Sequence, residues 1–232
     1  MKRHGLSLWP GFDVILLAMT VADRAPTELC GPDAQKLVSR RFFFSTSGTA
    51  FLIAVNTIVY LILPIAFKRD YPANYVALGG AWKPLALSEE WWRLVTSNFL
   101  QITPDHLLSN MVALWILGKR MERFFGSLGV IGFYLFCAVS ASIIILTIYP
   151  PTFVFYGASL AIAGMAGALL VIYGRVFLVL SRRAMLKYAA LVLFVANLAS
   201  GELVVTHVFS HTVGLLIGLS FAVVFESVGR KD

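Results

Sequence analysis

The sequence predicts an all-α membrane protein that crosses the bilayer several times. Of its 232 residues, 59% are hydrophobic and only 13% are charged, and the mean hydropathy is +0.81. A soluble globular domain carries about 25% charged residues, so this chain is too apolar to cover a soluble surface. Its apolar residues gather into stretches of about 20, the length of a membrane-spanning helix. These observations exclude a cytosolic enzyme, a disordered tail and a secreted disulfide scaffold.

Residues 1–47 are predicted to form a cytoplasmic or interfacial extension. The apolar stretch from Gly11 to Ala22 is interrupted by Asp13, which makes it too short and too broken for a span. No small-residue cleavage site follows a clean apolar core, so a signal peptide is not expected. Residues 48–226 are assigned to a membrane domain, and residues 227–232 to a short cytoplasmic tail.

Six transmembrane helices are expected in the membrane domain. The long loop between the first two contains Trp82, Trp91 and Trp92, which suits a structured segment at the membrane interface. The predicted limits of the spans are Gly48 to Phe67, Thr103 to Phe125, Gly129 to Tyr149, Gly157 to Gly174, Ala184 to Ala199 and Val204 to Phe225.

The positive charges predict the orientation of these spans. Of the 19 Lys and Arg residues, fifteen fall on the side that holds both chain ends. The other four are Lys68, Arg69, Lys83 and Arg93. Because cytoplasmic loops carry the excess of Lys and Arg, both termini are predicted to be cytoplasmic. The net charge of +7 is explained in this way, and no nucleic-acid partner is expected because no basic stripe interleaved with aromatic residues is present.

Polar side chains gather near the outer ends of the second, fourth and sixth spans. His106 and Asn110 lie one helical turn apart in the second span, Ser159 begins the fourth, and His207 and His211 lie in the sixth. Polar and ionisable groups at membrane depth are costly and tend to mark function. The sequence therefore predicts a site close to the outer face.

A serine beside histidines and an asparagine suits nucleophilic catalysis. The hydroxyl needs a base, and histidine is the usual base near neutral pH. An oxyanion needs fixed donors, which Asn, His and the N–H groups at a helix N-terminus can supply. No carboxylate lies at an obvious orienting position, so a Ser–His dyad is favoured over a triad.

Two other kinds of site fit the sequence less well. His207 and His211 have an i, i+4 spacing that suits a metal ion, with His106 as a third ligand, but no H-E-x-x-H motif accompanies them. A transporter would show inverted repeats or paired broken helices, and Asn56 and Pro64 in the first span define no pathway. No metal or other cofactor is therefore expected.

Five short motifs, in order between Phe51 and about Glu226, resemble those of the rhomboid family of intramembrane serine proteases. They are Trp92-Arg93, His106-x-x-x-Asn110, Gly118-x-x-x-Glu122-x-x-x-Gly126, Gly157-x-Ser159 followed by Gly164 and Gly167, and His211-x-x-Gly214-x-x-x-Gly218. Each motif alone is weak, but all five in order are specific. The resemblance implies a rhomboid-like bundle of six transmembrane helices with both termini in the cytoplasm.

The resemblance also implies a function. Ser159 would be the nucleophile and His211, rather than His207, the general base. His106, Asn110 and the Ser159 backbone N–H would form the oxyanion hole. Such a serine endopeptidase cleaves transmembrane segments of membrane proteins near the outer face, without metal or nucleotide.

Further motif residues are expected to have structural roles. Trp92 and Arg93 would anchor the outer loop, and Gly214 and Gly218 would let the fourth and sixth helices approach closely. The expected partners are transmembrane protein substrates and the lipid bilayer, and the expected location is a prokaryotic inner membrane. The sequence carries no signal for an oligomeric state.

Two residues depart from the family pattern. Leu160 follows the nucleophile where the family usually has Gly, so it would crowd the substrate carbonyl or narrow the range of side chains accepted before the cut. Ala163 replaces an aromatic residue that stacks on the catalytic histidine, so His211 would be less firmly held and the rate lower. The alternative function is therefore a catalytically weak or inactive rhomboid-like scaffold that binds membrane proteins.

Overall fold

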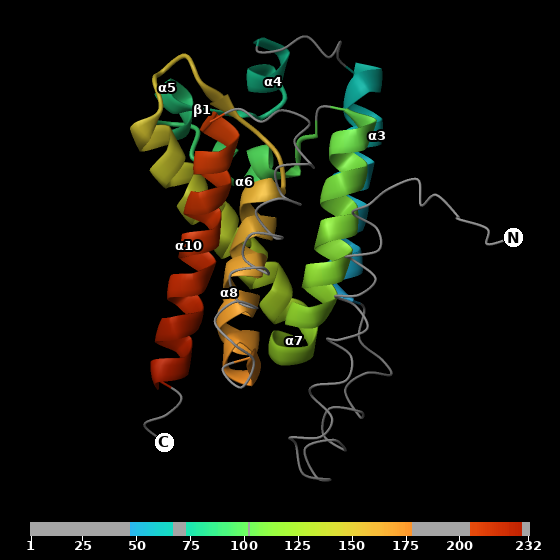
Figure 1. Ribbon diagram of the computed structural model, residues 1–232. Coiled ribbons are helices and arrows are strands. Elements are labelled where there is room, and N and C mark those ends of the chain that lie inside the picture. The colour runs from blue at the N-terminus through green and yellow to red at the C-terminus, as the bar shows by residue number, and fades with distance from the viewer. Residues whose placement is uncertain (1–46, 67–72, 102, 178–204, 229–232) are drawn as a thin grey trace, which may run out of the picture. The chain divides into compact units, whose positions relative to one another are not determined.

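The computed structural model describes residues 47–66, 73–101, 103–177 and 205–228 (Figure 1). The predicted extension, the fifth span Ala184 to Ala199 and the last residues of the tail lie outside the described residues. The four long helices of the described part are α3 (Gly48–Ala66), α7 (Pro104–Ile148), α8 (Ser159–Phe177) and α10 (Val205–Val228). They coincide with the predicted first, second, third, fourth and sixth spans, the second and third being joined within α7.

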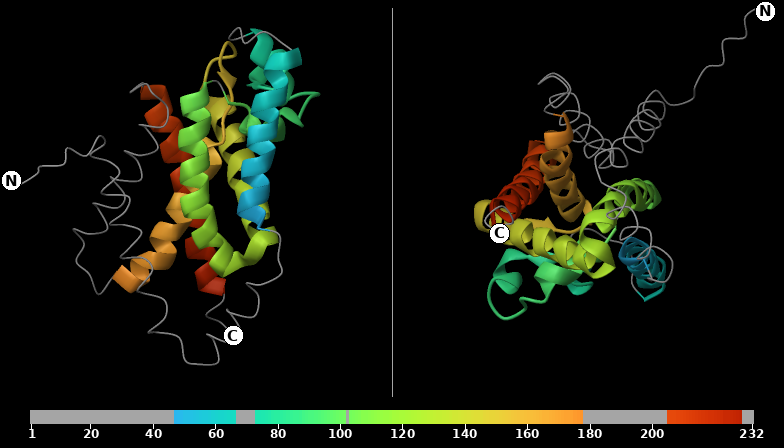
Figure 2. Two further views of the ribbon diagram at one scale, coloured as in Figure 1. Left: turned by 90° about the vertical axis from the view of Figure 1, so that its right-hand side faces the viewer. Right: turned by 90° about the horizontal axis from the view of Figure 1, so that it is seen from below.

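Helix α7 is a hairpin of two helical halves (Figure 2). Its 45 residues would extend about 67 Å if straight, more than twice the thickness of a bilayer core. Gly126 interrupts the helix with φ 70° and ψ 178°, a conformation that is essentially restricted to glycine. Among the described residues, apart from the adjacent backbone, no atom lies within 4 Å of the position of a Cβ at Gly126, so backbone conformation rather than space requires glycine here.

The Glu122 carboxylate joins this turn to the N-terminus of α3. Its Oε1 accepts hydrogen bonds from the Gly48 N–H and the Ser127 hydroxyl, both at 2.7 Å. Its Oε2 accepts three more, from Ser47 Oγ, Thr49 Oγ1 and Lys119 Nζ. A negative charge is favourable at a helix N-terminus, where backbone N–H groups lack intrahelical acceptors. Glu122 therefore fixes the first helix against the α7 turn.

At the end of α7 opposite this turn, residues 73–101 form a compact segment of short elements, named the outer segment after the side predicted for it from the sequence. These are α4 (Ala73–Ala77), β1 (Ala81–Trp82), α5 (Lys83–Ala86), α6 (Arg93–Thr96) and η1 (Ser97–Phe99). Strand β1 pairs antiparallel with β2 (Val154–Phe155), which lies just before α8. Trp82 Nε1 also donates to the Pro151 carbonyl at 2.6 Å. The outer segment is thus joined to the loop that leads into α8.

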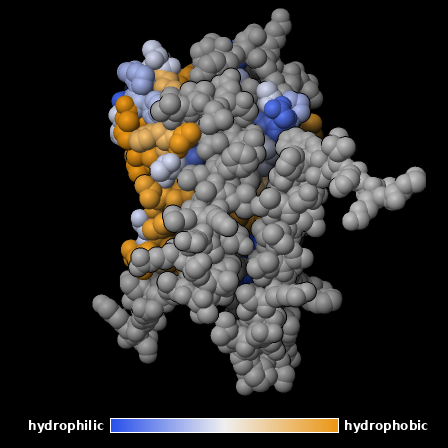
Figure 3. Space-filling view, viewed as in Figure 1, coloured by the Kyte–Doolittle hydropathy of each residue, from blue (hydrophilic) through white to orange (hydrophobic). Residues whose placement is uncertain are grey.

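Helix α8 lies at the centre of the described helices, and α7 and α10 pack against it (Figure 1). Every residue from Leu160 to Leu169 is buried. By contrast, α10 exposes a row of large apolar side chains, the last of them Val223, Val224 and Phe225 at 50%, 60% and 57%. Where described residues are visible in Figure 3, hydrophobic side chains dominate the face formed by α10. Among the described residues, α7 and the stretch Val208–Phe225 are long and apolar enough to cross a membrane.

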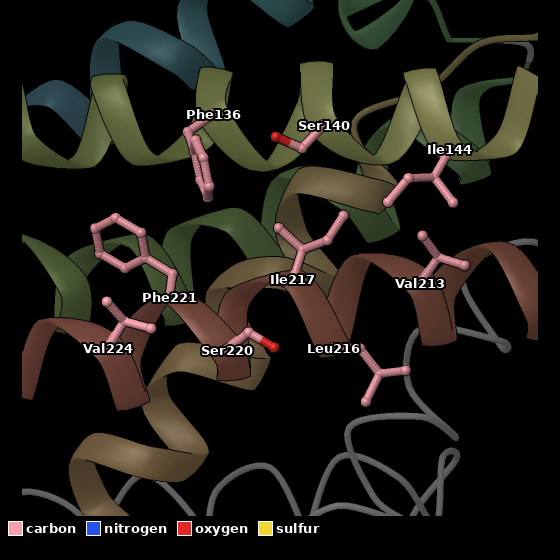
Figure 4. A pocket seen from close by; sticks show the side chains of 9 residues that line it. All are labelled: Phe136, Ser140, Ile144, Val213, Leu216, Ile217, Ser220, Phe221 and Val224. Atoms are coloured by element: carbon pink, nitrogen blue, oxygen red, sulfur yellow. The ribbon is translucent and has the colours of Figure 1, made fainter. Parts of the chain in front are cut away.

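An open apolar groove of about 630 Å³ runs between the second half of α7 and α10 (Figure 4). Ser140 on α7 and Ser220 on α10 are its two polar lining residues. The other lining residues are Phe136, Ile144, Val213, Leu216, Ile217, Phe221 and Val224. None of the candidate catalytic residues lines this groove.

Candidate functional site

Ser159 is the first residue of α8, and its side chain is half-buried. Two residues earlier, Gly157 has φ +112°, in the region that favours glycine. The Gly157 N–H donates to the Ser97 carbonyl at 2.8 Å, which fixes the turn to the outer segment. The Ser159 backbone N–H belongs to the first turn of the helix, where N–H groups lack intrahelical acceptors.

His106 lies at the same turn. A Cβ at Gly157 would lie 3.2 Å from His106 Cε1, 3.6 Å from His106 Nε2 and 3.9 Å from Ser159 Oγ. The imidazole and the hydroxyl therefore border the same small space, which the missing side chain of Gly157 leaves open. The cap of α7 sets the position of His106, because Thr103 Oγ1 accepts the His106 N–H at 3.3 Å and Pro104 occupies the first turn.

His211 reaches the same level through the packing of α8 on α10. A Cβ at Gly218 would lie 1.8 Å from the Gly164 carbonyl oxygen, and one at Gly214 would lie 2.5 Å from the Leu160 carbonyl oxygen. Both pairs are separated by the same number of residues, so the two helices run parallel in one register. That register places His211, which is 2% exposed, level with the turn that carries Gly157 and Ser159.

Asn110 is buried one turn after His106, and its amide has a partner that the sequence analysis missed. Asn110 Nδ2 donates to Gln101 Oε1 at 2.9 Å, and Gln101 Nε2 donates to Asn56 Oδ1 at 3.0 Å. The only sequence signal was Asn56, a polar residue inside an apolar span. Its contact with Gln101 depends on how α3 packs beside α7, which the sequence pattern does not specify.

Trp92 and Arg93 lie in the outer segment and hold it together. The Arg93 side chain is 6% exposed, and its Nη1 donates to the carbonyls of Val76 and Gly80. Arg93 also pairs with Glu90 and stacks on the Trp92 ring, with Cζ 4.6 Å from the ring centroid. Gly118 is equally structural, because a Cβ there would lie 2.8 Å from Thr49 Cγ2 on α3.

The two residues that depart from the family pattern are both buried. The Leu160 side chain is fully buried in an apolar cluster with residues of the outer segment, the loop before α8 and the second half of α7. Its members include Ala81, Ala86, Leu94, Ile145, Leu146 and Phe155. This packing accounts for a large side chain at Leu160. Ala163 faces α10, since its Cβ would lie 3.3 Å from a Cβ at Gly214.

Among the side chains that the structure describes, no group of three or more His, Cys, Asp or Glu is arranged to hold a metal ion. The side chain of His207, the third histidine of the metal alternative, lies outside that set. His106, Ser159 and His211 therefore stand at one level on three helices, with the Asn110 amide one turn below His106. The fold and this cluster define a helical integral membrane protein in which polar side chains gather at the N-terminus of α8 and in the second turn of the closely packed α10.

Known proteins place the chain in a family. The Rhomboid domain family matches residues 88–227. The chain is 33% identical to rhomboid protease GluP of Bacillus subtilis (strain 168) over 180 residues, which are 75% of this chain and 34% of GluP. It is 28% identical to Rhomboid-like protease 3 of Toxoplasma gondii over 175 residues, 72% of this chain and 65% of that protein. RHOMBOID-like protein 6, mitochondrial, of Arabidopsis thaliana is 31% identical over 137 residues, 59% of this chain and 44% of that protein. The chain belongs to the rhomboid family.

Proposed function

We propose that this protein is an intramembrane serine endopeptidase that cleaves transmembrane segments of other membrane proteins near the outer face. Ser159 is the nucleophile and His211 the general base. The observation that carries the proposal is the convergence of Ser159 Oγ and the His106 imidazole on the Gly157 turn, level with His211. The names of the bacterial relative and the Toxoplasma relative, both rhomboid proteases, support the same activity.

In the proposed reaction, Ser159 Oγ attacks the substrate carbonyl carbon while His211 removes the hydroxyl proton. The resulting oxyanion accepts hydrogen bonds from His106, Asn110 and the Ser159 backbone N–H. His211 then gives the proton to the leaving amine, and a water molecule hydrolyses the acyl-enzyme with His211 again as base. The N-terminus of α8 adds a favourable partial positive charge beside the oxyanion.

The proposal includes the topology of the chain, with six spans and both termini in the cytoplasm. The ends of α8 and α10 that carry the site then face the outer side, together with the outer segment of residues 73–101. The named relatives come from a bacterium, a protozoan and a plant mitochondrion, so they give no support to the expected prokaryotic inner membrane over an organelle.

Labelling by a fluorophosphonate probe tests the activated serine. Wild-type protein is expected to be labelled, whereas Ser159→Ala and His211→Ala are not, because the nucleophile or its base is missing. Ser140→Ala is a matched control, since Ser140 is also half-buried in a membrane helix, and it should be labelled like wild type. His207→Ala should also be labelled like wild type, because His211 rather than His207 is the proposed base. Absence of labelling in folded wild-type protein would reject the proposal.

A second candidate function is a rhomboid-like scaffold that binds membrane proteins and cleaves them slowly or not at all. Ala163 favours it, because a small residue faces α10 where the family has an aromatic ring against the catalytic histidine. A scaffold would capture a transmembrane client equally well after Ser159→Ala and would show no Ser159-dependent cleavage. Co-purification of client and protein from the same membranes, with cleavage measured in parallel, separates the two functions.

A further inference from the structure

Three buried side-chain amides form a hydrogen-bonded chain that begins at Asn110. As described above, Asn110 donates to Gln101, and Gln101 donates to Asn56. Asn56 Nδ2 then donates to the backbone carbonyl of Leu52, one turn earlier in α3, at 2.9 Å. Asn110, Gln101 and Asn56 are 2%, 5% and 0% exposed. The chain of amides therefore connects the candidate site on α7 to the first helix through the interior.

The direction of this chain is fixed at its far end. A backbone carbonyl can only accept a hydrogen bond, so Asn56 must turn its NH₂ toward Leu52 and its oxygen toward Gln101. Gln101 must then turn its NH₂ toward Asn56 and its oxygen toward Asn110. Reversing one amide would bring like groups together and leave buried polar atoms unsatisfied, which is energetically costly. Asn110 is thereby held as a donor.

We propose that Gln101 is a positioning residue that holds Asn110 in the orientation an oxyanion-hole donor requires, a role that rests on the proposed protease function. The Asn110 NH₂ has two N–H groups. Gln101 Oε1 accepts a hydrogen bond from one of them. Because this hydrogen bond fixes the orientation of the Asn110 amide, it also fixes the direction of the other N–H. Asn110 lies on the same face of α7 as His106, which borders the turn with Ser159. A donor fixed before the reaction needs no reorganisation as negative charge develops.

The consequence for α3 is that this helix contributes to the site although it carries none of the candidate catalytic residues. Asn56 supplies the fixed end of the chain of amides, and Gln101 transmits its direction to α7. The role of Gln101 is therefore separable from that of Asn110. Gln101 acts through Asn110, whereas Asn110 contacts the reacting oxygen directly.

Steady-state cleavage of a labelled transmembrane peptide by the full-length protein tests this role. Asn110→Ala is expected to lower kcat by about 10²–10³-fold. Gln101→Met keeps the side-chain volume but removes both hydrogen bonds, and it is expected to lower kcat by roughly 10- to 100-fold with KM unchanged. In the Asn110→Ala background the same Gln101→Met substitution should no longer change kcat, because the residue that it positions is gone.

Asn98→Leu is the matched control, since Asn98 is a fully buried amide that donates to the Leu94 carbonyl and Ser142 Oγ instead. Asn98→Leu should change kcat by the same factor in the wild-type and in the Asn110→Ala background. A Gln101→Met effect that is equally large in both backgrounds would show that Gln101 acts independently of Asn110 and would overturn the proposal.

Hydrogen exchange of the Asn110 side-chain amide, followed by NMR, gives a readout that needs no catalysis. The two protons are expected to exchange at different rates, because one is bonded to Gln101, and Gln101→Met should remove the difference. Equal rates in wild type would overturn the positioning role. Unequal rates without any Ser159-dependent cleavage would instead reject the protease function, and with it the catalytic role of Gln101.

Discussion

At the scale of single residues, Leu160 shows that the role of a side chain depends on the residues packed around it. Next to a nucleophile, a leucine suggests a blocked site. In the structure this side chain is fully buried in an apolar cluster that the outer segment and α7 complete. Its burial contributes to the stability of the fold, and the loop before Ser159 packs on the same cluster through Phe155.

Leu160→Ala is therefore expected to lower the free energy of unfolding by about 2–5 kcal/mol, because it leaves a cavity in this cluster. Leu160→Gly should lower it further, since glycine also disfavours helix. Denaturation in detergent measures both effects. Leu108→Ala is the control, because Leu108 is 65% exposed on α7 and should change stability by less than about 0.5 kcal/mol. Faster cleavage by Leu160→Gly at unchanged stability would contradict this interpretation.

Residue types and spacings were enough to nominate a cluster of Ser159, His106, Asn110, His207 and His211 from the sequence, and the resemblance then selected His211 over His207. The structure brings Ser159, His106 and His211 to one level. Gln101 could not be found in this way. It sits in a connection just before a helix cap, where a polar residue is usually solvated. Only the packing of α3 beside α7 buries it between Asn56 and Asn110.

At the scale of elements, long apolar stretches predicted the long helices because a membrane span must satisfy its own backbone hydrogen bonds. The short elements of the outer segment could not be predicted. They depend on distant contacts, such as the Arg93 side chain on the carbonyls of Val76 and Gly80 and the pairing of β1 with β2. A stretch of two to five residues carries too little pattern to reveal such contacts.

Gly126→Ala tests the turn within α7. The substitution is expected to destabilise the protein by about 1–3 kcal/mol, because alanine is strained at the φ and ψ of this residue. Gly132→Ala is a close control, since in the described part of the chain only adjacent backbone lies within 4 Å of a Cβ at either glycine, and Gly132 has no positive φ. It should be neutral or stabilising by about 0.5–1 kcal/mol, as expected in a helix interior. If the midpoint temperature of thermal unfolding falls equally for both variants, glycine is not required at the turn.

At the scale of the whole molecule, the proposed orientation rests on the distribution of Lys and Arg, which is a property of the sequence. The structure adds that α4 and α5 of the outer segment lie at one end of the helices and the turn of α7 at the other (Figure 1). Two exposed positions, Glu89 in the outer segment and Arg123 beside the turn, therefore report on opposite sides.

Cysteine accessibility tests this orientation after Cys30 and Cys137 have been replaced. A membrane-impermeant thiol reagent is expected to label Glu89→Cys in intact cells, because the outer segment faces away from the cytoplasm. Arg123→Cys should be labelled only after permeabilisation, which also shows that this thiol is reactive. The reverse pattern would invert the proposed topology and place the site on the cytoplasmic side.

The contact between α8 and α10 has a consequence for how this site can evolve. A methyl group at Gly218 would lie 1.8 Å from the Gly164 carbonyl oxygen, and one at Gly167 would lie 2.0 Å from that of Leu215. The smallest change available to mutation therefore already forces the two helices apart, and with them Ser159 and His211. Substitution of these glycines therefore cannot change the distance between the two helices in small steps. Under the proposed protease function, adaptation to new substrates would proceed through side chains at the rim of the site, while the spacing of Ser159 and His211 is inherited unchanged.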